Sequence, residues 1–132
     1  MPRILVVDDE PNVLRLIQVN LERQGYVVET APSAAHALEM LRACRPDLLI
    51  CDVMMPEMDG FELMEIVRRD PTLARLPVFL LPPRDFDAEA RARMRLITDV
   101  WLPKPFNPAE LIVMIKRFWS DPKEDGVIIY NH

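Results

Sequence analysis

The sequence predicts an α/β fold in which a parallel sheet carries helices on both faces. Five short apolar runs alternate with five longer segments in which apolar residues recur at helical spacing. The links between these segments are short, and many of the thirteen prolines fall within or beside them. Consecutive β–α units of this kind form parallel sheets with right-handed crossovers, so a helix layer is expected on each side of the sheet.

The five expected strands are short apolar runs, located at residues 3–7, 26–30, 48–51, 77–81 and 99–102. The first and third runs are continuously apolar, which is typical of strands that are buried on both faces. The fifth run is the weakest, because it is short and opens with Asp99.

The five expected helices have an apolar stripe along one face, and they span residues 11–24, 33–43, 59–69, 85–96 and 107–119. Pro11 suits the first turn of a helix, and Gly25 suits the position after its last turn. Ser33 is a suitable N-cap for the second helix, which Pro46 then closes off. Helices and strands therefore alternate along almost the whole chain.

Length and composition exclude several classes of protein. The chain has 132 residues, enough for one domain, and 50% hydrophobic residues exclude an intrinsically disordered chain. A net charge of −5 argues against a chain that mainly neutralises nucleic-acid phosphates. No apolar run reaches the roughly 20 residues of a membrane span, and two cysteines make no disulfide framework. A small, soluble, cytoplasmic domain without membrane contact is expected.

Charged residues follow several of the expected strands, at the point where each strand ends. Asp8, Asp9 and Glu10 follow the first strand, Asp52 follows the third, and Lys104 follows the fifth. Ligands of open α/β sheets bind beyond the carboxyl ends of the strands, so the three aspartates and the lysine are expected to converge there.

Carboxylates that crowd together repel one another unless a cation relieves them. Mg²⁺ is the natural candidate, because it binds one or two carboxylates together with water and phosphate oxygens. Each residue alone also has a structural interpretation: Asp8 or Asp9 could cap the first helix, and Lys104 could be a solvated surface lysine. Their joint placement at three strand ends favours an acidic metal pocket beside one lysine.

Three motifs give the chain a resemblance to the receiver domains of bacterial two-component response regulators. Residues 6–10 (VVDDE), 52–60 (DVMMPEMDG) and 102–106 (LPKPF) match that family in order and spacing. The resemblance covers about residues 2 to 119 and implies a receiver domain over 1–119, followed by a tail at 120–132. It implies a flavodoxin-like (βα)5 three-layer sandwich whose parallel strands have the order 2-1-3-4-5.

The resemblance also implies a role for each residue of the pocket. Asp52 resembles the phosphoacceptor, whose carboxylate attacks a phosphohistidine of a sensor histidine kinase or phosphotransfer protein. Asp9 and Asp8 would hold Mg²⁺ together with Asp52 and the backbone carbonyl of Met54. Lys104 would pair with the carboxylate and then with the phosphoryl group. Such a domain is no enzyme beyond its own phosphorylation and dephosphorylation.

The resemblance also concerns the positions that bind the phosphoryl group and respond to phosphorylation. Trp101 occupies the position of the family's switch aromatic, and the bond before Pro105 corresponds to a cis bond that orients the lysine. Pro82 stands where the family has a Thr or Ser hydroxyl that binds a phosphoryl oxygen. Pro83 stands where a backbone N–H would bind the same group, and proline has none. Two phosphoryl donors are therefore expected to be missing.

Three functions follow as alternatives. The first is a receiver phosphorylated on Asp52 that signals through protein contacts. The second is a phosphorylation-independent docking module, which the Pro82-Pro83 pair favours. The third, a phosphatase with an aspartyl nucleophile, would need a DxD pattern after the first strand and a larger chain.

The partners of a receiver are proteins. Only 13 residues follow Trp119, too few for a DNA-binding output domain, so the chain is expected to be either a stand-alone receiver or a piece of a longer regulator or hybrid kinase. A downstream effector protein is expected rather than direct DNA contact by this chain. The face built by the fourth helix, fifth strand and fifth helix is the family's usual partner surface and would allow a homodimer. Arg91, Arg95 and Lys116 would make this face basic, although a solvated arginine-rich face is an equal alternative.

Overall fold

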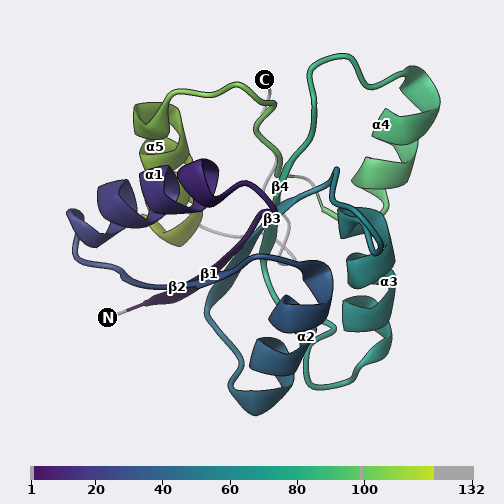
Figure 1. Cartoon of the computed structure of the whole chain (residues 1–132), viewed down its shortest axis with the longest axis horizontal. Coiled ribbons are helices and arrows are strands. Elements are labelled where there is room, and N and C mark those ends of the chain that lie inside the picture. The colour runs from purple at the N-terminus through teal and green to yellow at the C-terminus, as the bar shows by residue number, and fades with distance from the viewer. Residues whose placement is uncertain (1, 99, 121–132) are drawn as a thin grey trace.

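The computed structural model describes residues 2–98 and 100–120, and helices and strands alternate through them as expected (Figure 1). In chain order the elements are β1 (Arg3–Val7), α1 (Pro11–Glu22), β2 (Val27–Ala31), α2 (Ala34–Ala43), β3 (Leu48–Asp52), α3 (Gly60–Arg69), β4 (Val78–Leu81), α4 (Ala88–Arg95) and α5 (Pro108–Ser120). The α/β class is therefore confirmed. The tail that follows α5, residues 121–132, lies outside the described residues.

The sheet is parallel and has four strands in the order β2-β1-β3-β4. The prediction of a fifth strand is corrected, because the described residues 100–102 lie beside β4 but form only isolated bridges with it. The Leu80 N–H donates to the Val100 carbonyl at 3.2 Å, and the Leu102 N–H donates to the Leu80 carbonyl at 2.9 Å. The Lys104 N–H also donates to the Pro82 carbonyl, but Pro82 has no N–H to donate in return, so the alternating hydrogen bonds of a regular ladder are interrupted there. Asp99 lies outside the described residues.

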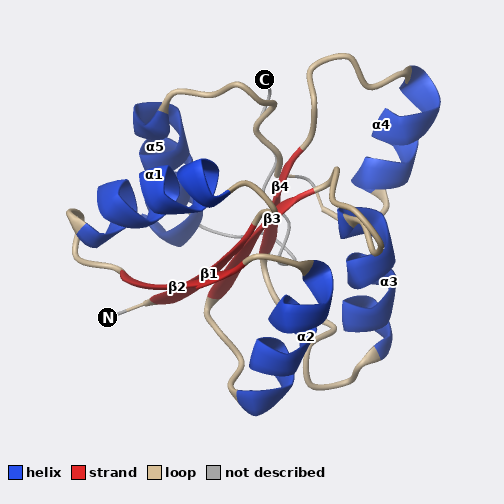
Figure 2. Ribbon diagram, in the orientation of Figure 1, coloured by secondary structure: helices blue, strands red, loops and turns tan. Residues whose placement is uncertain are grey.

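Helices cover both faces of the sheet, with α1 and α5 on one face and α2, α3 and α4 on the other (Figure 2). A cluster of buried apolar side chains lies between the sheet and each set of helices. Successive residues of β1 point to opposite faces: Ile4 and Val6 pack toward α1 and α5, whereas Leu5 and Val7 pack toward α2 and α3. All of these side chains are buried. The strands read as continuous apolar runs because both of their faces are covered.

Local capping decides where the helices begin. Ser33 caps α2, as predicted, by accepting a hydrogen bond from the His36 N–H at 3.1 Å. Asp59, expected inside the third helix, is instead the N-cap of α3 and forms a capping box with Glu62.

Helix α4 differs most from expectation, because it begins at Ala88 rather than at residue 85. The Asp87 carboxylate accepts from the Ala90 N–H at 2.8 Å and so fixes the start of the helix. The preceding residues 84 and 85 form a turn. Met94 is the one residue of α4 that is fully buried, and Arg93 adds contacts to α3 through Glu65 and the Phe61 ring.

The half-buried guanidinium of Arg68 ties three segments together at the end of the molecule where α3 finishes. Its nitrogens donate to the carbonyl oxygens of Ala74 at 3.0 Å, Leu76 at 2.7 Å and Ile97 at 3.2 Å. Those carbonyls belong to the link before β4 and to the segment after α4. One side chain therefore supplies hydrogen-bond donors to the backbone carbonyls of two loops, the loop that leads into β4 and the loop that leads into residues 100–102.

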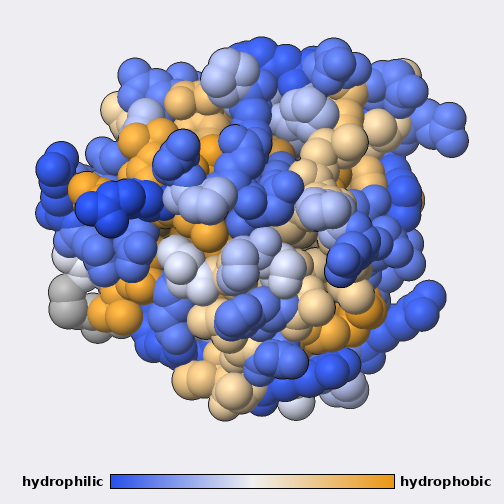
Figure 3. All heavy atoms as spheres, viewed as in Figure 1, coloured by the Kyte–Doolittle hydropathy of each residue, from blue (hydrophilic) through white to orange (hydrophobic). Residues whose placement is uncertain are grey.

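Hydrophilic residues cover most of the surface face in Figure 3, and apolar residues show between them in separate patches. Within the part of the chain that the structure describes, no helix is long and apolar enough to cross a membrane.

We expect Arg68→Met to lower the free energy of unfolding by about 2–4 kcal/mol, because three charge-assisted hydrogen bonds are lost while the aliphatic stem remains. Urea denaturation followed by circular dichroism measures the change. Arg69→Met is the matched control, since Arg69 is exposed on the same helical turn, and it should stay within about 0.5 kcal/mol of the parent. Equal losses in the two variants would contradict the role of Arg68.

Candidate functional site

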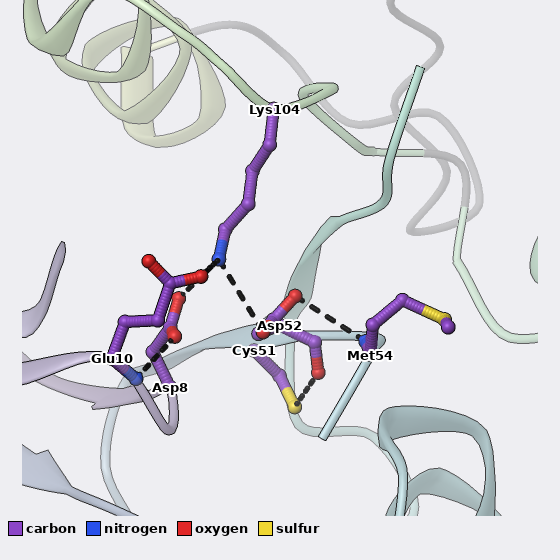
Figure 4. A network of polar contacts seen from close by, with 6 residues as sticks. All are labelled: Asp8, Glu10, Cys51, Asp52, Met54 and Lys104. Atoms are coloured by element: carbon purple, nitrogen blue, oxygen red, sulfur yellow. Dashed lines mark hydrogen bonds and ion pairs between the residues drawn. The ribbon is translucent and has the colours of Figure 1, made fainter. Parts of the chain in front are cut away.

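Three charged side chains from distant parts of the chain meet at the carboxyl edge of the sheet, as Figure 4 shows. Asp8 follows β1, Asp52 ends β3, and Lys104 follows the residues that run beside β4. Both carboxylates are almost fully buried, with exposed fractions of 0% for Asp8 and 3% for Asp52. The predicted convergence of these three residues is therefore what the fold produces.

Glycine is required at position 60 so that α3 can begin against the end of β3. The Gly60 N–H donates to the Val53 carbonyl at 2.9 Å. A Cβ atom at position 60 would lie 2.6 Å from the Asp52 backbone oxygen and 2.9 Å from the Val53 Cα, closer than such contacts allow. The start of α3 thus fixes the backbone that carries Asp52.

The loop that carries Lys104 is held against the end of β4. The Lys104 N–H donates to the Pro82 carbonyl at 2.8 Å, and Lys104 forms an isolated parallel bridge with Pro83. The Lys104–Pro105 peptide bond is cis, the isomer that the resemblance implies. These backbone contacts aim the lysine side chain across the sheet edge toward the two carboxylates (Figure 4).

One ammonium group serves three carboxylates. The Lys104 Nζ lies 2.6 Å from Asp8 Oδ2 and 3.3 Å from Asp52 Oδ2. It also lies 4.0 Å from Glu10 Oε1. Backbone donors supplement it, because the Glu10 N–H donates to Asp8 Oδ1 at 2.9 Å and the Met54 N–H donates to Asp52 Oδ1 at 3.3 Å. Lysine therefore bonds Asp8 more closely than Asp52.

Burial has the largest influence on the pKa values of the two buried carboxylates. Burial, reinforced by the neighbouring charge of Asp8, raises the pKa of Asp52 to about 6 despite the opposing influence of Lys104. Burial likewise raises the pKa of Asp8, although the hydrogen bond from Lys104 opposes it. Burial tends to lower the pKa of Lys104, but its bonds to Asp8 and the charge of Asp52 outweigh that effect and raise the pKa overall. The site holds more negative charge than its one cation neutralises.

The chemistry of these ligands fits a hard divalent cation. Carboxylate oxygens of Asp8, Asp9 and Glu10 lie within 4.8 Å of one another, and Asp52 faces Asp8 across the lysine. Such a cation would relieve the excess negative charge that raises the pKa values of the buried pair. Glu10 was not predicted as a site residue, although its place in the Asp8-Asp9-Glu10 run is a signal that could have identified it.

A cavity of about 450 Å³ opens beside Asp52. Its polar lining consists of Glu10, Asp52 and Lys104. The remaining lining residues are apolar, and they are Val13, Leu16, Met54, Pro83, Pro105 and Phe106. The cavity is large enough to admit a side chain or a small phosphorylated group to the carboxylate.

Of the other predicted site residues, some line this cavity and others do not. Pro83 lines it, whereas Pro82 is buried behind it. Trp101 is half-buried against the core on the α3 side and does not line the cavity. The guanidinium carbon of Arg95 lies 5.9 Å from the centre of the Trp101 ring, which joins α4 to this edge of the sheet. Asp9 is exposed beside the buried pair.

The chain matches the family described as "Response regulator receiver domain" over residues 4–116. An uncharacterized 14.6 kDa protein of Leptolyngbya boryana is 41% identical over 115 residues, which cover 87% of this chain and 88% of that protein. The alkaline phosphatase synthesis transcriptional regulatory protein PhoP of Bacillus subtilis is 37% identical over 114 residues. That match covers 86% of this chain and 47% of PhoP, so the chain spans about half of that relative's length.

Solved structures show the same likeness. The chemotaxis protein CheY4 of Vibrio cholerae superposes with a TM-score of 0.81 at 33% identity, covering 89% of this chain and 98% of that structure. The receiver domain of a signal transduction histidine kinase from Syntrophus aciditrophicus gives a TM-score of 0.82 at 31% identity. That match covers 98% of this chain and all of the other. The flavodoxin-like fold is therefore confirmed.

We expect Asp52→Asn to stabilise the metal-free protein by about 2–3 kcal/mol at pH 7.5, because each unit of pKa shift corresponds to ~1.4 kcal/mol. The folded state binds a proton on Asp52 more tightly than the unfolded state does. Stability of the parent therefore falls as pH rises from about 4 to about 6, and the full penalty is present above that range. Asparagine carries no such penalty.

Urea denaturation at several pH values, in the presence of a chelator, checks this expectation. The advantage of Asp52→Asn should shrink as pH falls below 6 and vanish near pH 4. Asp85→Asn, which changes an exposed carboxylate after β4, is the matched control and should show little change at any pH. A parent more stable than Asp52→Asn at pH 7.5 would contradict the expected burden of buried charge.

Proposed function

This chain belongs to the response regulator receiver domain family, and we propose that its Asp52 accepts a phosphoryl group from the phosphohistidine of a sensor histidine kinase or phosphotransfer protein. One observation carries the proposal: Asp52 is a nearly buried carboxylate at a cavity wall, with an oxygen 3.3 Å from the Lys104 ammonium. Receiver domains are two-component signalling modules and generally not enzymes.

In the proposed transfer, a carboxylate oxygen of Asp52 forms a bond to phosphorus while the bond between phosphorus and the imidazole nitrogen breaks. The imidazole leaves with the electron pair of that bond and takes up a proton. Lys104 stays protonated, because its pKa is raised by its partners, and offers N–H donors to the charge on the transferring oxygens. Phosphoryl transfer depends mainly on such positioning and charge neutralisation.

Receiver domains of response regulators generally bind Mg²⁺. Here Asp8, Asp9, Asp52 and the backbone carbonyl of Met54 would hold the ion, and Glu10 would add negative charge beside them. The bound ion supplies positive charge to the phosphoryl oxygens. Asp8 must then share its charge between the ion and Lys104, which lies 2.6 Å away.

Signalling is proposed to proceed through protein contacts in the cytoplasm with a downstream effector. The segment formed by α4, residues 100–102 and α5 is the proposed partner surface, including that of a homodimer. The contact of Arg95 with Trp101 supports it, because it links an exposed arginine to the switch position. The relative PhoP is about twice as long as the matched region, so its whole activity is not transferred to this chain.

Intact mass spectrometry after incubation with Mg²⁺ and phosphoramidate tests phosphorylation directly. We expect one phosphoryl adduct on the parent and none on Asp52→Asn or after addition of a chelator, because both the nucleophile and the charge neutralisation are needed. Pro82→Thr restores the missing hydroxyl and should gain the adduct faster than the parent. An adduct on Asp52→Asn would show that another residue is the acceptor.

Two further outcomes separate the alternatives. No adduct on the parent, but one on Pro82→Thr, would assign the defect to the missing hydroxyl and favour a phosphorylation-independent docking module. No adduct on either protein would contradict the proposed function.

A further inference from the structure

A phosphoryl group on Asp52 would have three oxygens and few donors to receive them. Among the described residues that line the cavity, Lys104 is the one cation, and most of the others are apolar. The Met54 N–H and the Lys104 ammonium already face the two Asp52 oxygens. Pro83 lines the same wall and has no N–H to offer.

The negative charge makes this shortage acute. A phosphoryl group carries about two negative charges at neutral pH. Asp8 is buried beside it, and Glu10 lies within 4.0 Å of the same lysine. Even with a divalent ion in place, the carboxylates and the phosphoryl group together exceed the positive charge that Lys104 and the ion supply. A further cation near the cavity would therefore be strongly favoured.

Arg84 is positioned to be that cation. It follows Pro83 directly and opens the turn before α4, and its side chain is exposed. Its Nη2 donates to the carbonyl oxygen of Pro105 at 2.7 Å, and Pro105 is itself part of the cavity wall. The guanidinium is thus held beside the loop that carries Lys104 and against a residue of the cavity wall, although Arg84 does not itself line the cavity. Only one of its five N–H donors is used in that bond among the described residues.

We propose that Arg84 is a phosphoryl-binding residue, which turns from the Pro105 carbonyl to donate to the phosphoryl group on Asp52 and so takes over the task that Pro82 and Pro83 cannot perform. This inference rests on the proposed phosphorylation of Asp52. A guanidinium suits the task because its planar fork can bind two phosphate oxygens at once. The competing carbonyl is neutral, whereas the phosphoryl group is a dianion, so the exchange of partners is favourable.

Beryllofluoride, a tetrahedral stand-in for the phosphoryl group, tests the contact at equilibrium. Its affinity in the presence of Mg²⁺ is measured by fluorine NMR on the full chain, and the phosphoramidate reaction rate is measured alongside. We expect Arg84→Ala to weaken beryllofluoride binding about tenfold and Arg84→Lys to weaken it less. Arg75→Ala, an exposed arginine in the link before β4, is the matched control and should equal the parent.

A double-mutant cycle with Pro82→Thr distinguishes phosphoryl contact from loop support. If Arg84 substitutes for the missing donors, Arg84→Ala should cost much less in the Pro82→Thr background, because the hydroxyl then shares the task. If Arg84 acts on the phosphoryl group and not by supporting the loop that carries Lys104, the affinity for Mg²⁺ alone should stay unchanged. A loss that is equal in both backgrounds, or a matching loss of Mg²⁺ affinity, would overturn the proposal in favour of a structural tie to Pro105.

Different outcomes test the role of Arg84 and the phosphorylation of Asp52. If the parent takes up the phosphoryl group and Arg84→Ala behaves like the parent, the role of Arg84 is wrong while the proposed function stands. If neither the parent nor any variant binds beryllofluoride or is phosphorylated, the proposed function and the role of Arg84 are both wrong.

Discussion

The electrostatic imbalance at the sheet edge organises the whole molecule. Asp8 and Asp52 are buried side by side with one shared ammonium, and burial disfavours the charge of both carboxylates. A fold that keeps two such groups ionised gives up stability for a site that attracts positive charge. The surrounding structure must therefore be rigid enough to hold the two carboxylates together. The parallel sheet provides this rigidity, because apolar side chains pack against both of its faces.

Backbone contacts connect the site to this rigid core. Gly60 brings the start of α3 against the carbonyl of Asp52, and the Lys104 N–H is tied to the Pro82 carbonyl. Helix α4 differs from its neighbours, because Met94 is its one buried residue and its contacts with Glu65 and with Trp101 come from exposed arginines. The acceptor carboxylate is thus held by buried backbone, whereas the neighbouring helix is held largely by side chains at the surface.

The sequence predicted the four strands of the sheet and the convergence of Asp8, Asp52 and Lys104, because buried parallel strands are continuous apolar runs and their carboxyl ends share one edge. It did not predict the start of α4, which depends on the Asp87 cap rather than on apolar spacing. Nor did it predict the closeness of Glu10 or the bond from Arg84 to Pro105, because both depend on how loops from distant segments lie against each other. Local patterns indicate elements, whereas contacts between loops need the assembled fold.

The bridges beside β4 also bear on how the sheet avoids pairing with other chains. Leu102 and Lys104 both direct their N–H groups inward, toward β4. In an extended segment the alternate positions face outward, and one of those, Pro103, carries no N–H. A foreign strand that approached this edge would lack a donor at that position. The proline that precedes the lysine therefore also helps to protect this edge against aggregation.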